Sequence, residues 1–457
     1  MIKKSFYNFT YEHSDGYLLL YNTFTGAFIA VEPKTKQVVK NILLSPNEIE
    51  KSTEKDILLQ QGFLIDDSFN EIAQIKSRFE YFKNNNNLIS FTILPTENCN
   101  FKCPYCFIYD RRGLVMQSCV YEGIFNRIKK VIKPGLKLTL NWFGGEPTLE
   151  KKAILSFMGK VQTLFKEYPE SKLYSTIVTN GYLLDSKTFR DFLRSGISIY
   201  QVTLDGNEIT HNKTRMLKDG SGTFKRIVNN LKDIKNSLNK DDDFEFMIRV
   251  NFLKDQDKEV DEIINLFKNI FGEDKRFHIY FRAVYDIETC RQDSQNISSQ
   301  IYQAVNGIKK QADYYLQASE EIGRLENTLP IVSPVPNPIP GWCSAQRVHS
   351  YIIGADGTVS KCETYIGKSD KSSGKINKDG EIEESNTAEE WNESIFDNPK
   401  YTVCMECKFL PICQGGCPRG RQERVEKHLC FYNEELIKHG MISTHLFNKN
   451  HRTTKEK

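Results

Sequence analysis

Short apolar runs alternate with longer amphipathic segments through the middle of the chain. The runs are rich in β-branched and aromatic residues and end near Gly, Asp, Asn or Pro, which predicts strands. They cover 88–95, 136–143, 174–180, 197–204, 244–252 and 277–284. Between them, apolar positions recur at intervals of three and four, which predicts helices. Six strand–helix units favour a parallel α/β domain, either a barrel-like curl or an open doubly wound sheet, with its chemistry at the carboxyl edge of the strands.

Residues 1–80 follow a different pattern. An apolar stretch with a turn from Asn22 to Gly26 predicts a hairpin, and the segments 35–44 and 54–62 predict helices. This small α+β module either presents a strand edge or helix groove to a peptide, in the manner of a winged helix, or extends the central domain by packing. The polar run 83–87 predicts a connector, and the five prolines of 330–342 predict a second, stiffer one.

Composition narrows the class of protein. The chain has 457 residues, of which 39% are hydrophobic and 26% charged, as in globular proteins. Its 62 basic and 59 acidic residues give a net charge of +3, which offers little general attraction to nucleic acid or anionic membranes. The start of the chain has no apolar core of a signal peptide, and no later run approaches the length of a membrane helix. We therefore expect a cytoplasmic protein with neither nucleic acid nor membrane as a partner.

The chain has twelve cysteines, and ten of them are clustered. In a reducing compartment disulfides are rare, so clustered thiols indicate metal ligands. One group is Cys99, Cys103 and Cys106, another is Cys343 and Cys362, and the last is Cys404, Cys407, Cys413, Cys417 and Cys430. Cys119 and Cys290 stand apart, and we interpret them as incidental. Three thiolates on a [4Fe–4S] cluster leave one iron open to a further ligand, whereas zinc needs a fourth protein ligand or a water.

The first group resembles CX3CX2C, the signature of the radical S-adenosylmethionine (SAM) enzymes. The resemblance spans about 88–284 and implies a partial (β/α)6 barrel. In that family SAM chelates the open iron through its amino and carboxylate groups. Its reductive cleavage yields a 5′-deoxyadenosyl radical that abstracts a hydrogen from the substrate. The resemblance therefore implies SAM and a [4Fe–4S] cluster as cofactors.

Further motifs at predicted strand ends support this resemblance. GGEP at 144–147 matches the motif that binds the amino group of SAM, and its glycines are expected to let the backbone approach the cofactor closely. In related enzymes the residue matching Thr203, often a serine, contacts the ribose of SAM. The arginine matching Arg215 lies near the SAM carboxylate, and the aromatic residue matching Tyr105 lies against the adenine. The residues thus implied in SAM binding are Tyr105, Gly144, Gly145, Glu146, Thr179, Asn180, Thr203, Asp205 and Arg215.

The C-terminal cysteines resemble a SPASM domain, whose spacing CX9–15GX4C–CX2CX5CX3C–C they match throughout. The resemblance implies two auxiliary [4Fe–4S] clusters, making three in all. One would take Cys404, Cys407, Cys413 and Cys430, and the other would take Cys343, Cys362 and Cys417. The fourth position of the latter is open to His349 or to a substrate. A pair of zinc sites is the alternative, but seven cysteines do not fill two four-cysteine sites.

SPASM enzymes mostly modify peptides, which leaves two substrate classes. We interpret the chain as a maturase that installs an oxidative cross-link, of thioether or carbon–carbon type, in a ribosomally made peptide whose leader sequence residues 1–80 would recognise. The alternative is an anaerobic sulfatase-maturing enzyme that forms formylglycine and has an acidic base after the residue matching Cys362. Glu363 stands there and is the candidate catalytic base. Either enzyme needs a one-electron reductant such as flavodoxin or ferredoxin. A non-catalytic electron carrier is a third hypothesis, which the SAM motifs disfavour.

The predicted fold is α/β, and the predicted organisation has five parts. A small α+β module covers 1–80, a radical SAM partial TIM-like barrel covers 88–284, and a helical and proline-rich bridge covers 285–342. A cysteine-rich iron–sulfur SPASM domain follows at 343–430, and a C-terminal helix with a basic tail at 431–457.

Overall fold

The computed structural model describes residues 1–49, 51–108, 112–284, 300–323, 333–385, 391, 393–423 and 430–455. Its main sheet has ten strands in the order β11-β10-β9-β8-β7-β6-β12-β13-β14-β15. The six central strands are β6 (Leu88–Ile93), β7 (Lys137–Trp142), β8 (Lys172–Thr179), β9 (Ile199–Thr203), β10 (Glu245–Phe252) and β11 (Phe277–Ala283). All are parallel to their neighbours among the six, as the strand–helix alternation predicts.

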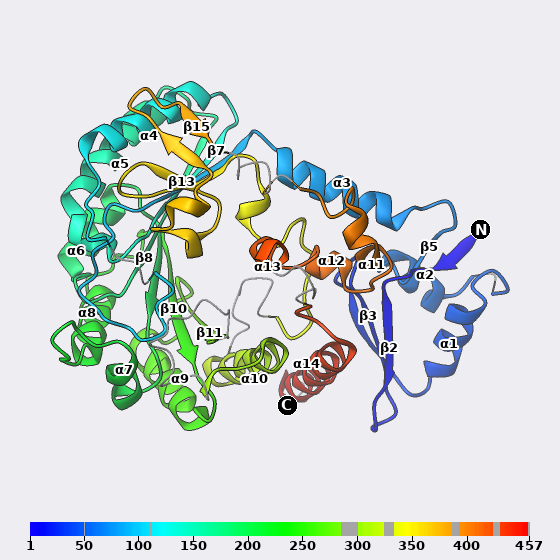
Figure 1. Ribbon diagram of the computed structural model, residues 1–457. Helices are drawn as coiled ribbons and strands as arrows, with labels where there is room; N and C mark the ends of the chain where they lie inside the picture. The colour runs from blue at the N-terminus through cyan, green and yellow to red at the C-terminus, as the bar shows by residue number, and fades with distance from the viewer. Residues whose placement is uncertain are drawn as a thin grey trace.

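Helices cover the outer face of this curled sheet (Figure 1). They are α4 (Ser118–Val131), α5 (Lys151–Phe165), α6 (Ser186–Arg194), α7 (Glu208–Thr214), α8 (Phe224–Asn236) and α9 (Asp257–Phe271). Alternate strand residues such as Phe246, Ile248 and Val250 are fully buried in one hydrophobic core with the helices. Their neighbours in sequence therefore face the inside of the barrel, because successive strand side chains point to opposite faces. The predicted partial TIM-like barrel is confirmed.

The cysteine-rich region begins as an extension of the barrel sheet. Strand β12 (Ser350–Ile353) pairs in parallel with β6, so that Ile353 lies opposite Ile93. Strands β13 (Thr358–Ser360), β14 (Gly374–Ile376) and β15 (Ile382–Glu384) continue the sheet in antiparallel fashion. The short helices α11 (Thr402–Met405), α12 (Leu410–Cys413) and α13 (Pro418–Glu423) follow, and α14 (Glu434–Lys455) ends the described chain.

The N-terminal module has two small sheets. One pairs β1 (Ile2–Lys4) with β5 (Leu64–Asp66), and the other holds β2 (Asn8–Glu12), β3 (Leu18–Asn22) and β4 (Phe28–Val31). Helices α1 (Lys36–Leu44) and α2 (Thr53–Gln60) lie where the periodicity predicts them. Helix α3 (Glu71–Asn84) was not predicted and extends into the expected connector. Figure 1 shows the module beside α11, α12 and α14, and Leu19 and Tyr21 of β3 pack in one core with Ile437 and Met441 of α14.

The predicted bridge contains one long helix, α10 (Ala304–Ile322), which packs against β11 and α14. Residues 285–299, with Cys290, and residues 324–332 lie outside the described residues, so that part of the predicted bridge is not placed. In the described ranges, none of the helices combines the length and the apolar character needed to cross a membrane.

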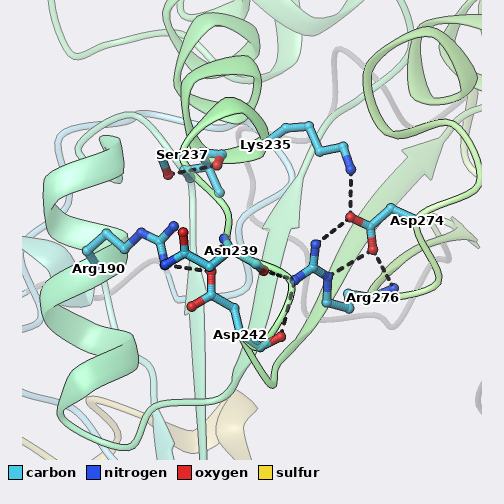
Figure 2. Close-up of polar contacts among 8 residues, drawn as sticks. Arg190, Lys235, Ser237, Asn239, Asp242, Asp274 and Arg276 are labelled. Atoms are coloured by element: carbon cyan, nitrogen blue, oxygen red, sulfur yellow. Dashed lines mark hydrogen bonds and ion pairs between the residues drawn. The ribbon is translucent and has the colours of Figure 1, made fainter.

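An ion-pair network closes the amino edge of the barrel strands (Figure 2). Arg190 of α6 pairs with Asp242 at 2.6 Å. Asp274 binds Lys235 at 2.6 Å and Arg276 at 2.8 Å, and Arg276 also donates to the carbonyl of Asp242 at 3.2 Å. These loops lead into β10 and β11, so the network fixes where both strands begin.

Candidate active site

The first cysteine group lies on the loop after β6, at the carboxyl edge of the barrel. Cys99 and Cys103 are buried and Cys106 is half-buried, and all three are thiols outside any disulfide bond among the described residues. Both of the other thiols act electrostatically on Cys103, so the three lie together. Burial raises the pKa of the Cys103 thiol to about 12. Such thiols stay neutral until metal displaces their protons, so this group suits a metal cluster whose separate metal atoms each take one thiolate.

The GGEP glycines hold this loop in place. The Gly145 amide donates to the Thr96 carbonyl at 3.1 Å, and the Glu146 amide donates to the Asn98 carbonyl at 2.8 Å. A Cβ on Gly145 would lie 2.0 Å from the Asn98 oxygen, and one on Gly144, whose φ is +117°, would lie 2.5 Å from the Thr96 oxygen. No other residue fits at either position. The sequence analysis expected these glycines to let the backbone approach the cofactor. In the structure they let it approach the backbone of the cysteine loop.

Glu146 is 1% exposed and joins the ends of β7 and β8. Its Oε1 accepts hydrogen bonds from the Thr148 amide (3.0 Å), the Thr148 hydroxyl (2.5 Å) and the Thr179 hydroxyl (2.6 Å). Its Oε2 accepts one from the Asn180 amide at 2.7 Å. Burial raises the pKa of the carboxyl, and these bonds oppose the rise. A carboxylate oxygen has about two acceptor positions, so Oε2 can take one more donor, such as an ammonium group.

A buried polar network joins the cysteine loop to the end of β9. The Asp205 carboxylate accepts hydrogen bonds from the Tyr105 hydroxyl, from Thr214 Oγ1 at 2.9 Å and from Asn251 Nδ2 at 3.3 Å. Arg215 Nη1 donates to the Tyr105 oxygen at 3.1 Å. Burial raises the pKa of the Asp205 carboxyl, and the charge of Arg215 opposes this rise. Tyr105, expected to lie against adenine, is thus held through its hydroxyl.

Arg215 is the cation of this edge and is only 8% exposed. Its guanidinium lies over the ring of Phe101 at 5.6 Å, and its charge opposes the rise that burial causes in the pKa of the neighbouring Cys103. Its Nε is buried without a hydrogen-bond partner among the described residues. An orphaned donor beside the cysteine group fits an absent anionic ligand. Thr203, at the end of β9, is buried on the same edge.

Two functional candidates in this network escaped the sequence analysis. Asn251 is the last residue but one of β10, and Arg249 Nε donates to its Oδ1 at 2.8 Å. His211 Nδ1 accepts a bond from the Asp205 amide at 3.1 Å, and burial lowers the pKa of the ring. Asn251 had a usable signal, since it is a polar residue at the carboxyl end of a predicted strand. His211 had none, because only the tertiary structure brings it to Asp205.

The C-terminal cysteines gather into two sets. Electrostatic interactions connect Cys343 with Cys362 and Cys417. A separate set is connected in the same way, and its members are Cys404, Cys407, Cys413 and Cys430. The two sets are those that the SPASM resemblance implies.

Backbone amides point at these sulfurs. The amide of Ala345 bonds Cys343, those of Phe409 and Leu410 bond Cys407, and that of Gly415 bonds Cys413. Burial raises the pKa of Cys343 and of Cys413 to about 12. Neighbouring, partly buried thiols that receive N–H···S bonds fit iron–sulfur clusters, in which such bonds tune the sulfurs.

His349 lies in a basic environment. Burial lowers the pKa of its ring first, and then the charges of Lys361, Arg347, Arg127 and Lys133 lower it further. Its backbone carbonyl accepts a bond from the Ser90 amide at 3.0 Å, which ties it to the β6–β12 pair. His349 thus lies directly before β12, next to the first strand of the barrel.

Glu363 begins the short helix η5 (Glu363–Tyr365), directly after Cys362. Its side chain is exposed, yet surrounding protein raises the pKa of its carboxyl, and the charge of Arg249 opposes the rise. Arg249 belongs to the inner face of β10, because its neighbours Ile248 and Val250 are buried in the outer core. The Glu363 carboxylate is thus within electrostatic reach of an arginine on the inner face of the barrel.

Comparison with known proteins decides the class of enzyme. Residues 93–267, which hold the CX3CX2C loop, GGEP and the Asp205 network, match the Radical SAM superfamily. This part of the chain is a radical SAM domain. Members of this superfamily bind SAM at a [4Fe–4S] cluster, and this radical SAM enzyme accordingly has both as cofactors.

Its relatives include two kinds of maturating enzyme. The cysteine-type anaerobic sulfatase-maturating enzyme of Clostridium novyi (strain NT) is 23% identical over 367 residues, which cover 73% of this chain and 89% of the relative. The serine-type enzyme of Bacteroides thetaiotaomicron is 23% identical over 364 residues, or 72% and 81% of the two chains. The solved structure of native anSMEcpe with bound AdoMet matches with a TM-score of 0.55 and 20% identity, over 79% of this radical SAM enzyme and 99% of that chain. This last likeness supports the fold.

Proposed function

We propose that this radical SAM enzyme matures a peptide by installing an oxidative cross-link of thioether or carbon–carbon type. When bound, SAM and its cluster supply a 5′-deoxyadenosyl radical for hydrogen abstraction. The observation that favours this function is the N-terminal module, which packs on the cysteine-rich region through Leu19, Tyr21 and α14. We propose that the module binds a leader sequence of the peptide substrate, close to the region that we assign to the auxiliary clusters.

The chain's own residues divide the binding of SAM among them. Cys99, Cys103 and Cys106 would hold the cluster. The free acceptor position of Glu146 suits the amino group of SAM, and the orphaned Nε of Arg215 suits its carboxylate. The remaining residues that we assign to SAM binding or to the shape of its site are Tyr105, Gly144, Gly145, Thr179, Asn180, Thr203 and Asp205.

We assign two auxiliary [4Fe–4S] clusters to the C-terminal cysteine sets, which makes three clusters in all. Cys404, Cys407, Cys413 and Cys430 give one a complete thiolate shell. Cys343, Cys362 and Cys417 leave the other with an open position, for which His349 and the substrate are the candidates. A one-electron reductant of the flavodoxin or ferredoxin class would supply electrons.

Glu363 is the residue that we assign to proton transfer. A cross-link removes two hydrogens from the peptide: one leaves as an atom with 5′-deoxyadenosine, and the other leaves as a proton and an electron. Glu363 directly follows Cys362, and its carboxylate is within electrostatic reach of an arginine on the inner face of the barrel, so it can accept that proton. The auxiliary cluster that Cys343, Cys362 and Cys417 would hold would accept the electron, so that the chemistry would balance with one electron put in and one recovered.

A mass measurement tests this function. The enzyme is co-expressed anaerobically with any short open reading frame next to its gene, and the intact mass of the peptide is taken. We expect a loss of two hydrogens for each cross-link, located between two side chains by fragmentation. Glu363→Gln should still form 5′-deoxyadenosine while it loses most of the cross-linked product, and Glu363→Asp should retain product. Equal loss of both products in Glu363→Gln would remove Glu363 from proton transfer.

A second function is favoured by the relatives, which are named sulfatase-maturating enzymes. In this alternative the enzyme oxidises a cysteine or serine of a sulfatase to formylglycine. An unchanged neighbouring peptide, together with conversion of a sulfatase-derived CxPxR peptide to an aldehyde, would support this function and contradict the cross-linking one.

A further inference from the structure

Tyr7 connects β1 and β2 of the N-terminal module, and its side chain is 1% exposed. Its ring stacks on Phe24, with ring centroids 6.1 Å apart, and meets the edge of Phe6 at 5.2 Å. The hydroxyl oxygen is buried and has no hydrogen-bond partner among the residues that the structure describes. Because burying a hydroxyl without a hydrogen-bond partner is unfavourable, we expect this oxygen to have a partner that the described residues do not supply.

The surroundings of Tyr7 point to the cysteine-rich region. Its ring belongs to a hydrophobic cluster against which Cys404 and Met405 pack. The charged groups that act on its hydroxyl are Glu71 and Cys407. The Glu71 carboxylate is already bonded by the Ser5 hydroxyl at 2.5 Å and by the Phe6 amide at 3.0 Å. The hydroxyl therefore has two neighbours with acceptor capacity, the Glu71 carboxylate and the Cys407 sulfur, and the packing of Cys404 and Met405 against the same cluster favours the sulfur.

Water does not account for the orphaned oxygen. Tyr7 lines a hollow together with Phe6, Phe69, Met405 and Glu406, and this hollow opens to solvent. The tyrosine oxygen itself is shielded from solvent. Water in the hollow can thus contact the ring but cannot reach the hydroxyl.

We propose that Tyr7 donates its hydroxyl hydrogen to a sulfur of the auxiliary cluster held by Cys404, Cys407, Cys413 and Cys430. This inference rests on the auxiliary cluster of the proposed function and adds a positioning residue from outside the cysteine-rich region. A hydrogen bond to a cluster sulfur stabilises the more negatively charged reduced state, so it raises the reduction potential. The N-terminal module thereby sets the potential of a cluster, in addition to packing against it.

The reduction potential of the clusters tests this proposal in the holoenzyme. Tyr7→Phe keeps the ring and removes only the hydroxyl. We expect it to shift the potential of one auxiliary cluster to a more negative value in an EPR-monitored titration, and to leave the other two clusters unchanged. Proton ENDOR of the reduced cluster should also lose one exchangeable coupling.

Tyr21→Phe is the matched control, since Tyr21 is a buried tyrosine of the same module whose hydroxyl already bonds the Pro336 carbonyl. It should leave all potentials and the exchangeable coupling in place. Unchanged potentials with a retained coupling in Tyr7→Phe would overturn the proposal, as would equal shifts in both variants.

Iron analysis separates this failure from failure of the cluster assignment. Three clusters correspond to about twelve iron atoms per chain. A reconstituted wild-type enzyme with about four iron atoms and full SAM cleavage would refute the auxiliary clusters, and with them the role of Tyr7. Full iron content with no effect of Tyr7→Phe would refute only the role of Tyr7.

Discussion

The two edges of the barrel carry similar charged side chains in opposite circumstances. At the amino edge, Asp274 is paired with both Lys235 and Arg276, and the pKa of its carboxyl lies well below its usual range. At the carboxyl edge, burial raises the pKa of the Asp205 carboxyl despite its hydrogen bonds, and Arg215 keeps an unbonded Nε. Charges at the amino edge are paired for stability, whereas those at the carboxyl edge are buried at a cost, as is typical of functional sites.

The largest effect is expected at the cysteine loop. Cys103→Ala should reduce SAM cleavage to background, because two thiolates do not hold the cluster, while the barrel stays folded. Formation of 5′-deoxyadenosine measures the loss, and far-UV circular dichroism reports the fold. Cys119→Ala, which changes an exposed cysteine of α4, is the control and should retain activity. SAM cleavage by Cys103→Ala would contradict the cluster assignment.

Replacing one aspartate by asparagine at each edge tests this difference most directly. Asp205→Asn removes charge-assisted hydrogen bonds to Tyr105 and Thr214, each worth about 1.5–3 kcal/mol. We therefore expect kcat/KM for SAM to fall by about tenfold to a hundredfold. The thermal midpoint should hold or rise, because a costly buried charge is gone. A lower thermal midpoint with unchanged kcat/KM would show that Asp205 contributes to stability and not to SAM binding.

Asp274→Asn is the counterpart at the amino edge. It leaves Arg276 and Lys235 without their anion, and both are partly exposed, so the free energy of unfolding should fall by about 2 kcal/mol. Activity per folded molecule should not change. Urea unfolding and SAM cleavage, measured on the same preparation, check the two halves of this expectation.

The difference in the free energy of unfolding between the wild type and Asp274→Asn should depend on pH. The reason is the lowered pKa of Asp274, whose main cause is its hydrogen bond with Arg276. A carboxyl with a lowered folded pKa contributes stability above the unfolded value of about 3.9 and loses it as the pH falls toward the folded value. The gap between the wild type and Asp274→Asn should therefore persist at neutral pH and shrink below about pH 4. A gap that widens in acid would show that another group controls it.

The smallest effect is expected from an exposed charge of the amino edge. Arg194 has a side chain that is 76% exposed and lies 3.7 Å from Asp191. Arg194→Ala should change the free energy of unfolding by less than about 0.5 kcal/mol. A larger loss of unfolding free energy, measured with urea, would mean that the exposure of an ion pair at this edge does not predict its contribution to stability.

Local patterns made much of the fold predictable. The six barrel strands were predicted within two residues at each end. Side chains along a strand point alternately to its two faces, and this two-residue period is visible in the sequence of even a short segment. The cysteine spacings were readable for a similar reason, since ligands on one loop must lie a few residues apart. Helix α3 was missed because its buried apolar face is narrow: Ile75 and Phe79 are its fully buried apolar residues, and its end lies in the polar run 83–87.

The sequence by itself thus determined the strands, most of the helices and the ligand-bearing loops. Only the tertiary structure decided which distant segments meet: β12 against β6, Asn251 and His211 against Asp205, and Tyr7 against the loop of Cys407. The physical reason is that periodicity and ligand spacing are properties of neighbours along the chain. Contacts across the molecule instead depend on how the core packs, and a single position in the sequence carries no mark of its partner.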